Sequence, residues 1–385
     1  MRRGLALTSM AVLLAACTGQ SLDRAGPVDQ LGRNWLSPAM PGTACRVPGG
    51  DGRMQLAERG IGGTGPITKP PDKPDPDSVP PPIGVAAVIT GFGSVCLAGL
   101  EVDLAPSLTV TSDGVATEAS ALAAGDRALL IATWTGQRPQ TAKVAIRHEI
   151  IGPVDSVADD GSIVVAGQTV RIAAGAWMPV ALAPGRWVAV SGLPQPDGGV
   201  LASRIDAAAT GTALLHGQLQ RQGRGYRIGT LPVMGAGLAA LSGQRVRLIG
   251  LLVDGGLEVT QATPDLLQTN PASVFGAGIN HYAIQALVGA APRGAMPFAV
   301  HMALPPGVAL PSVNEPAVLG LVRSAATGLV ATSVSVSPAE MGKAAGAAGP
   351  SGDGNGPGPS GGAGVNRGEG GGHAGGPGGG PGGGP

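Results

Sequence analysis

The middle of the chain, residues 84–264, alternates apolar and polar positions with a period of two. Such alternation predicts β-strands that bury one face, as in residues 187–190 (WVAV) and 246–249 (VRLI). Glycines stand before and after these segments and permit tight turns that β-branched residues could not adopt. The pattern therefore predicts short strands joined by hairpins rather than helices.

The same order of segments recurs in residues 84–148, 152–206 and 211–264. Each unit has an opening strand, a hairpin around V-x-G-x-x-V or a relative, the motif L-x-x-G-x-x-V-x-V-x-G, and a final strand. A period of roughly 55 to 60 residues suits units of about five short strands, each closed as a small barrel or stacked on its neighbours. A degenerate copy follows in residues 279–337. We therefore predict an all-β fold of tandem small, OB-like β-barrel modules.

Low-complexity segments flank these units. Residues 66–82 contain eight prolines and predict an extended, semi-rigid spacer. Residues 344–385 are dominated by Gly and Pro and predict disorder, while the broken G-x-y period excludes collagen. The predicted organisation is a signal peptide (1–16), a tether with Gly-rich and Pro-rich linkers (17–83), β modules (84–151, 152–210 and 211–270), a degenerate β module (271–340) and a disordered tail (341–385).

A family resemblance rests on the turn and strand motifs. The chain resembles a bacterial repeat known as domain of unknown function 5666, which occurs in secreted proteins and lipoproteins. The segments that carry the resemblance are GFGSVCLAGLEV (91–102), IVVAGQTV (163–170), LAPGRWVAVSG (182–192) and LSGQRVRLIG (241–250). The resemblance covers roughly residues 58–264. It implies compact β modules and assigns no chemistry to them.

The first residues predict export. In residues 2–16, two arginines precede an apolar stretch of secretory length that is too short to span a membrane. The ending LAAC (14–17) resembles the lipobox of bacterial lipoproteins, which implies that Cys17 becomes the lipidated N-terminus. Thr18 stands where an Asp would indicate inner-membrane retention, and this favours the outer membrane. The alternative is an ordinary secreted protein cleaved near Ala16.

Two further cysteines, Cys45 and Cys96, remain once Cys17 is set aside. In an oxidising compartment an even remainder favours one disulfide, which would link the N-terminal segment to the first β unit. The alternative is a pair of buried free thiols.

The charge balance and the low aromatic content bear on which classes of molecule the protein can bind. Lys plus Arg and Asp plus Glu number 25 each, so the chain has no basic field and we expect no nucleic acid partner. Aromatic residues are only 2% of the chain, whereas oligosaccharide sites rely on aromatic stacking. Trp134, in ATWTGQRPQ beside a predicted loop, is the one candidate for a ligand platform.

Motifs for catalysis do not meet their structural requirements. The five histidines are scattered without metal-site spacing, and the G-x-S-x-G of residues 358–362 lies in the Gly-rich tail. Asp159-Asp160-Gly161 predicts a hairpin turn rather than a calcium loop. GIGGTG (60–65) has the spacing of G-x-G-x-x-G, but no buried strand precedes it and prolines follow it, which argues against a dinucleotide site. We expect no cofactor, no metal and no enzymatic activity.

Together these observations predict a lipid-anchored protein of the bacterial cell envelope, held in the outer membrane and facing the periplasm or the exterior. Its expected role is structural or interactive, with a membrane contact through the lipid and an envelope protein or polysaccharide as partner. The alternative is a β module that binds a glycan or a small ligand.

Overall fold

The computed structural model describes residues 80–135, 138–287, 315–324 and 328–336. All of these residues belong to one compact unit. The described part is built of strands with three short helical turns, so the predicted all-β fold is confirmed. These turns are η3 (Ala119–Ala121), α2 (Leu238–Leu241) and α3 (Ala272–Phe275). No helix within the described ranges is long and apolar enough to cross a membrane.

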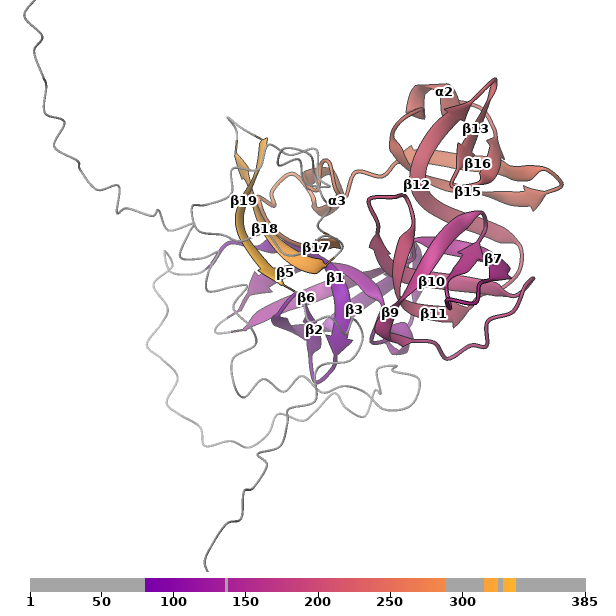
Figure 1. Ribbon diagram of the computed structural model, residues 1–385. Helices are drawn as coiled ribbons and strands as arrows, with labels where there is room; N and C mark the ends of the chain where they lie inside the picture. Colours follow the sequence, from indigo (N-terminus) through magenta and orange to yellow (C-terminus); the bar gives the residue numbers. More distant parts are fainter. Residues whose placement is uncertain (1–79, 136–137, 288–314, 325–327, 337–385) are drawn as a thin grey trace, which may run out of the picture. The chain divides into compact units, whose positions relative to one another are not determined.

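Module 1 is a ring of strands in which β1–β2–β3–β6–β5 returns to β1 (Figure 1). The β3–β6 pair is parallel and the other pairs of the ring are antiparallel, while β4 forms a hairpin with the end of β3. The strands are β1 (Ile83–Gly91), β2 (Val95–Leu97), β3 (Leu100–Ser112), β4 (Val115–Thr117), β5 (Arg127–Trp134) and β6 (Pro139–Arg147).

Modules 2 and 3 repeat this ring as two closed five-stranded barrels. Module 2 has the order β7–β8–β9–β11–β10–β7 and module 3 the order β12–β13–β14–β16–β15–β12, each with one parallel pair. The predicted small OB-like barrels are thereby confirmed. The strands are β7 (Ile150–Val157), β8 (Ile163–Val165), β9 (Gln168–Trp177), β10 (Trp187–Pro194), β11 (Val200–Ala207), β12 (Thr212–Gln222), β13 (Gly225–Ile228), β14 (Leu231–Met234), β15 (Arg245–Val253) and β16 (Gly256–Pro264).

The turn inside V-x-G-x-x-V has the same geometry in modules 1 and 2. Ala98 and Gly99 join β2 to β3, and Ala166 and Gly167 join β8 to β9, with φ values of 53°, 75°, 45° and 72°. Two consecutive residues with positive φ define the two-residue hairpin that matches the right-handed twist of its strands. The motif is therefore the hairpin that its sequence predicts.

The last glycine of L-x-x-G-x-x-V-x-V-x-G also has one role in two modules. Gly192 in β10 and Gly250 in β15 each lie where the register with the next strand shifts. A Cβ on Gly192 would lie 2.2 Å from the carbonyl oxygen of Leu201, and one on Gly250 would lie 2.1 Å from that of Glu258. Because the partner backbone passes this close, only glycine fits at either β-bulge.

The described strands of the predicted fourth module join the sheet of module 1. They are β17 (His281–Leu287), β18 (Pro316–Ser324) and β19 (Gly328–Val336). β17 pairs in parallel with β1, and β18 and β19 follow as an antiparallel meander. The side-chain oxygen of Gln285 accepts a hydrogen bond from the Val88 amide at 2.8 Å. Residues 288–314 lie outside the described residues, so the limits of this module stay a prediction.

Three main hydrophobic cores lie inside these sheets. One fills module 1, including Val85, Ile89 and Leu130, and a second fills modules 2 and 3. A third lies against the outer face of module 1, where β17–β19 and α3 contribute Phe275 and Tyr282 with ring centroids 5.9 Å apart. This third core covers part of the outer face of β5 and leaves a hollow beside it.

Candidate functional site

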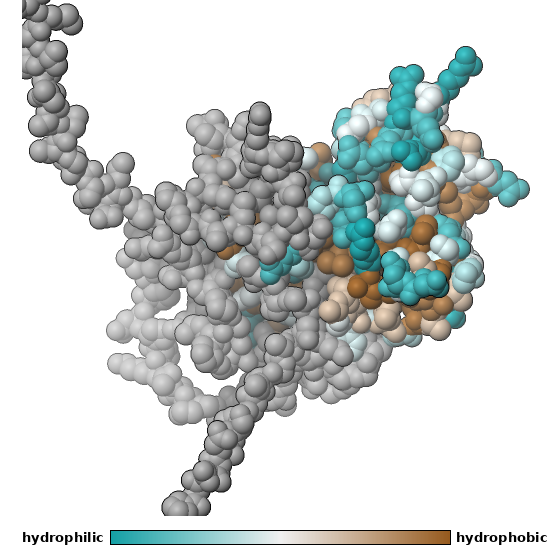
Figure 2. All heavy atoms as spheres, viewed as in Figure 1, coloured by the Kyte–Doolittle hydropathy of each residue, from teal (hydrophilic) through white to brown (hydrophobic). Residues whose placement is uncertain are grey.

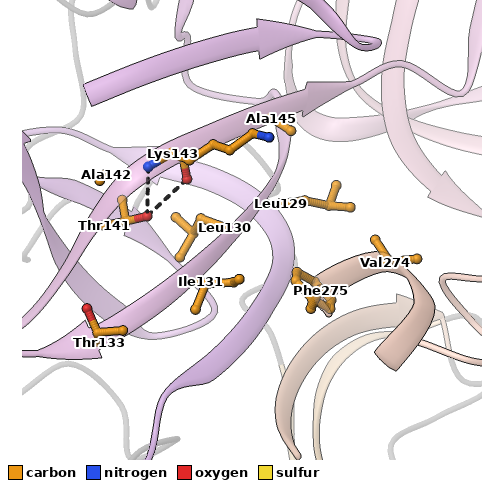
Figure 3. A pocket seen from close by; sticks show the side chains of 10 residues that line it. All are labelled: Leu129, Leu130, Ile131, Thr133, Thr141, Ala142, Lys143, Ala145, Val274 and Phe275. Carbon is orange, nitrogen blue, oxygen red and sulfur yellow. Dashed lines mark hydrogen bonds between the residues drawn. The ribbon is translucent and has the colours of Figure 1, made fainter. Parts of the chain in front are cut away.

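The hollow on module 1, named here the β5–β6 cleft, has a volume of about 480 Å³ (Figure 3). Strand alternation places Leu129, Ile131 and Thr133 on the outer face of β5. Thr141, Lys143 and Ala145 lie correspondingly on β6, and α3 contributes Val274 and Phe275. The cleft thus has an apolar wall and a few polar side chains, which is the usual composition of a small-molecule site.

The polar groups of the cleft hold the backbone of β6. Thr141 Oγ1 donates to the Lys143 carbonyl at 2.9 Å and accepts from the Lys143 amide at 3.3 Å. The Lys143 side chain is exposed and extends along β6 towards Ala145 (Figure 3). Within the described residues it forms no ion pair. The cleft therefore offers an apolar surface with one ammonium group at its edge.

The lining of the cleft contains no His, Cys, Asp or Glu side chain. Lys143 is the one lining residue with a titratable side chain. Among the residues that the structure describes, no cluster of three His, Cys, Asp or Glu side chains is placed to hold a metal ion.

A second feature is a cluster of buried charges where the three modules meet. This junction network consists of Arg127, Arg147, Glu149, His216, Arg245 and Asp265. Its centre is Glu149, which lies between β6 and β7 and is fully buried. The Glu149 carboxylate lies 2.6 Å from Arg127 Nη1, 3.0 Å from Arg147 Nε and 2.6 Å from Arg245 Nη2. Arginines of module 1 and module 3 thus share one carboxylate.

The backbone of Glu149 also joins two modules. Its amide donates to the Val190 carbonyl of β10, and its carbonyl accepts from the His216 amide of β12, both at 2.8 Å. Next to this residue, β7 pairs with β12 through Ile150 and Leu215. Glu149 is therefore fixed by module 2 and module 3 through its main chain as well as through its side chain.

Asp265 provides the second carboxylate of the network. Its Oδ2 lies 2.6 Å from Arg147 Nη2 and 3.0 Å from Arg245 Nε. Arg147 Nη2 also lies 2.9 Å from His216 Nδ1. The same Nδ1 atom lies 3.2 Å from Asp265 Oδ2, so His216 contacts both a donor and an acceptor of the network through one ring nitrogen. The network thus joins β6, β12, β15 and the segment after β16.

Proton equilibria agree with this arrangement. Burial raises the pKa of Glu149, but Arg147, Arg127 and Arg245 outweigh it and hold that pKa well below its usual range. Arg147 and His216 likewise hold the pKa of Asp265 far below its usual range in spite of burial. Both carboxylates are therefore ionised near neutral pH.

The pKa values of the basic groups in the network are also shifted. Burial lowers the pKa of Arg127 to about 10, even though Glu149 acts in the opposite direction. Its Nε and Nη2 atoms are buried and have no hydrogen-bond partner among the described residues. Burial and the neighbouring Arg147 lower the pKa of His216, which favours the neutral imidazole. Three arginines thus face two carboxylates that are almost fully buried, with Arg147 and Arg245 partly exposed at the edge of the network.

A smaller contact links module 1 to module 2 beside the network. Arg204, on β11, is fully buried and forms a bidentate pair with Asp206. Its Nη1 donates to the Ala124 carbonyl at 3.1 Å, and Ser203 Oγ donates to the Gly125 carbonyl at 2.6 Å. The turn before β5 is therefore bound directly by β11.

Two titratable groups near this contact, Asp126 and His148, have perturbed pKa values. Burial raises the pKa of Asp126 to about 6, although His148 and Arg204 partly oppose it. His148 Nδ1 lies 2.7 Å from Asp113 Oδ2. Burial lowers the pKa of His148, but the Asp113 hydrogen bond and nearby carboxylates raise it above the ordinary value. These groups are held by salt bridges and hydrogen bonds that join modules.

Our sequence analysis missed this network, although one signal was available. The last strands of modules 1 and 2 each contain an arginine that is followed two residues later by an acid, Arg147 with Glu149 and Arg204 with Asp206. In both pairs the arginine Nε donates to the acid. A charged pair at the same point of two repeats indicates contact with a neighbouring module rather than with solvent.

The structure places the predicted site residues as follows. Cys17 and Cys45 lie outside the described residues, whereas Cys96 is buried in β2 and is disulfide-bonded. The Cys45–Cys96 pairing itself stays a prediction. Trp134 ends β5 and is partly buried against the core of module 1, a position that does not match a freely exposed ring.

The Asp159-Asp160-Gly161 segment forms a turn. Asp160 Oδ1 accepts from the Ser162 amide at 2.9 Å, and Gly161 has a φ of 80°. Of the five histidines, His301 and His373 lie outside the described residues, as do the GIGGTG and G-x-S-x-G segments. The three described histidines lie in different surroundings and do not converge.

The fold and these sites define a class of all-β proteins built from small OB-like barrels. Within the chain, residues 151–206 match the family model described as domain of unknown function (DUF5666). The match spans the module 2 barrel from β7 to β11. No curated protein and no solved structure matches the chain.

Proposed function

We propose that this protein is a lipid-anchored component of the bacterial cell envelope that presents tandem β modules to a protein or polysaccharide partner. The observation that carries the proposal is the N-terminal segment, in which an apolar stretch ends in LAAC at Cys17. Acyl chains on Cys17 would hold the protein on a membrane, since each buried CH₂ contributes about 0.8 kcal/mol. The proposed location is the outer membrane.

The junction network supports a presenting role. Glu149 and Asp265 bind arginines from two modules, so surfaces on different barrels keep a fixed spacing. A rigid unit binds an extended partner with less loss of conformational entropy than modules on flexible linkers. We include in the proposal that all three barrels are tandem repeats of the family that module 2 resembles, because the strand order recurs.

Fractionation of cells with mass spectrometry of the N-terminus tests the anchor. We expect the wild-type protein in the outer-membrane fraction, with an acylated residue 17 as its first residue. The Cys17→Ser variant should keep its signal peptide or appear in the soluble fraction. A wild-type protein that is cleaved near Ala16 and soluble would refute the proposal.

A partner test follows from the same proposal. Crosslinking of the lipidated protein in cells, followed by affinity purification, should recover an envelope protein or a polysaccharide reproducibly. Recovery of the same material with the Cys17→Ser variant would show that the contact does not depend on the anchor. A reproducible failure to recover any partner would contradict the presenting role.

A second candidate function is binding of a small ligand, and the β5–β6 cleft favours it. Its apolar wall and the Lys143 ammonium suit a molecule with an apolar body and one anionic group. Anilinonaphthalene sulfonate has this chemistry and reports binding by its fluorescence. We expect saturable binding that Val274→Asp and Lys143→Gln both weaken at least fivefold, whereas Arg186→Gln, on an exposed loop of module 2, leaves it unchanged.

If a glycan binds at Trp134, we expect tryptophan fluorescence to change when oligosaccharides are added. The Trp134→Ala variant should abolish this change. Unchanged fluorescence with every oligosaccharide would refute a role for Trp134 in glycan binding. Equal dye binding by the wild type and all variants would refute the β5–β6 cleft as a ligand site.

A further inference from the structure

Charge is distributed unevenly in module 3. Between Asp206 and Asp254 the chain contains five arginines and no Asp, Glu or Lys. The chain as a whole is neutral, so this stretch is a local excess of positive charge. The outward positions of a β-barrel accept side chains of either charge, so the barrel fold does not explain why these 47 residues contain no acid.

Two of the five arginines have partners in the junction. Arg245 binds Glu149 and Asp265, and Arg247 donates to the Asp113 carbonyl at 2.9 Å. The other three, Arg221, Arg224 and Arg227, lie in the hairpin that β12 and β13 form. Within the described part of the chain none of these three makes an ion pair. Their charges are therefore uncompensated by protein groups.

The hairpin, residues 218–229, concentrates these charges at one end of the barrel. The strand pair closes at Gln222 and Gly225, so that Gly223 and Arg224 form the turn, with a φ of 60° at Gly223. Arg221 lies one rung behind the closing pair and Arg227 two rungs behind it. At about 3.3 Å per residue, all three guanidinium groups start within roughly 10 Å of the tip.

The faces of the hairpin follow from its register. Leu219 and Ile228 lie opposite each other and are fully buried in the barrel core. The next pair, Gln220 with Arg227, therefore points outward, and so does Gln222 near the tip. Arg221 pairs with Tyr226 and starts from the opposite face of the hairpin, where its side chain is exposed. The guanidinium groups of Arg221 and Arg227 contact only nearby backbone carbonyls, of Gly223 and Gly229, at 3.3 Å. Figure 2 shows hydrophilic residues gathered over the part labelled α2 and β13 in Figure 1.

We propose that the β12–β13 hairpin is a docking surface for an anionic polysaccharide. The guanidinium fork matches carboxylate and phosphate groups with two parallel hydrogen bonds, and the flanking glutamine amides match sugar hydroxyls. Arg221 and Arg227 start from the two faces of the hairpin and Arg224 lies in the turn, so a glycan with a repeated acidic unit meets all three charges where it crosses the tip. The exposed charges make this contact dependent on ionic strength.

The hairpin chemistry favours a glycan over other polyanions. Membrane surfaces are recognised by clusters of four to eight basic residues, and this hairpin has three and no apolar side chain at its tip. Single-stranded nucleic acids require several stacking rings, and Tyr226 is the one aromatic residue of the hairpin. Tyr226 packs partly against the barrel core, which limits its use as a platform.

The inference rests on the proposed envelope function and names the partner class for it. Its test uses purified full-length protein and does not depend on lipidation. A protein that is absent from the envelope would overturn the proposed function alone, whereas a membrane-bound protein without glycan binding would overturn this inference alone.

The experiment measures binding of the full-length protein to a polyuronate at 20 mM and 200 mM salt. Neutral dextran of equal length is the comparison probe. The test variant is Arg221→Gln with Arg224→Gln and Arg227→Gln. The matched control replaces three exposed arginines of modules 1 and 2 by Gln, namely Arg138, Arg171 and Arg186, so that the net charge changes equally.

We expect wild-type binding to polyuronate but not to dextran, weakened at least fivefold by the higher salt. The hairpin variant should lose at least tenfold in affinity and the control variant less than twofold. Unchanged circular dichroism and melting temperature show that each variant is folded. Equal losses in both variants, no polyuronate binding at 20 mM salt, or tighter binding to single-stranded DNA or to phosphatidylserine vesicles would each overturn the proposal.

Discussion

Replacement of Glu149 by Gln tests whether the junction network stabilises the protein. Glutamine keeps the volume of the side chain but removes the negative charge that Arg127, Arg147 and Arg245 share. Its amide group also adds N–H donors that face guanidinium donors. The variant therefore leaves buried positive charges opposed only by Asp265.

The expected cost follows from burial. Removing one partner of a fully buried ion pair costs about 3–5 kcal/mol, because the remaining charge is neither hydrated nor paired. Glu149 is 0% exposed, so little solvent screening reduces this figure. For a cooperative unit of about 200 residues, each kcal/mol lowers the melting temperature by about 2–4 °C. We expect a decrease of about 6–20 °C.

Chemical and thermal unfolding, followed by circular dichroism and tryptophan fluorescence, measure this loss. The matched control is Asp197→Asn, which removes a carboxylate from an ion pair with Arg171 at 2.8 Å. The side chains of Asp197 and Arg171 are 53% and 50% exposed, so the control should cost less than about 1 kcal/mol. The two variants thus compare the loss of a carboxylate charge at a buried site with the same loss at an exposed site.

The pH profile provides an independent check. Because the pKa of Glu149 is held below its unfolded value, the stability it contributes is present above about pH 4.5. It is lost as the pH falls through the folded-state pKa. The difference between wild type and Glu149→Gln should therefore be constant near neutrality and shrink below pH 4.5. A difference below about 1 kcal/mol at pH 7, similar to that of Asp197→Asn, would refute the stabilising role of the network.

Three other variants test separate features. Burial raises the pKa of Asp126 to about 6, so the stability that its protonated form contributes is present below pH 3.8 and is lost as the pH rises through 6. This loss amounts to at most about 3 kcal/mol of unfolding free energy. In urea unfolding at several pH values, Asp126→Asn should remove this pH dependence. Gly192→Ala should cost at least about 3 kcal/mol because its Cβ meets a backbone oxygen at 2.2 Å, while Gly278→Ala, with open space around it, should be neutral. Cys45→Ser should leave Cys96 open to alkylation after denaturation without reductant, and an unmodified Cys96 would contradict the predicted pairing.

Much of the fold was accessible from the sequence because its signals are local. Alternation marks the strands, and an Ala-Gly or Gly turn at a fixed place in the repeat marks the hairpins. The final glycine of the long motif proved to be a β-bulge, where the cause is a close backbone approach that only the partner strand reveals. The repeat thus predicted barrel modules, while the closure of each ring required the structure.

The candidate sites were less accessible. The members of the junction network are far apart in sequence, and a lone arginine on an amphipathic strand usually faces solvent. Arg127 and Arg245 are buried or partly buried only because another module covers their face. The β5–β6 cleft likewise depends on α3, which comes from a segment more than 100 residues later. Trp134 was selected from its loop context, and the packing of its ring could not be derived locally.

The pairing of β17 could not be predicted from the sequence either, since its parallel partner is β1, the first strand of the described chain. Parallel pairing needs a long connection, and nothing in residues 281–287 identifies β1 rather than a strand of the same segment as the partner. We grouped this strand with its sequence neighbours, whereas its hydrogen bonds reach back across both complete barrels.

This return of the chain to β1 has a consequence for biogenesis. The Val88–Gln285 hydrogen bond spans 197 residues, whereas the ring of each later barrel closes within about 55 residues. The entropy of closing a loop grows only logarithmically, but contacts this distant form late. Modules 2 and 3 can fold as soon as their own residues are available, while the edge of β1 waits for nearly the entire described chain. The first strand of the described chain is therefore among the last to acquire all its partners, and its edge is the part that a chaperone would need to protect.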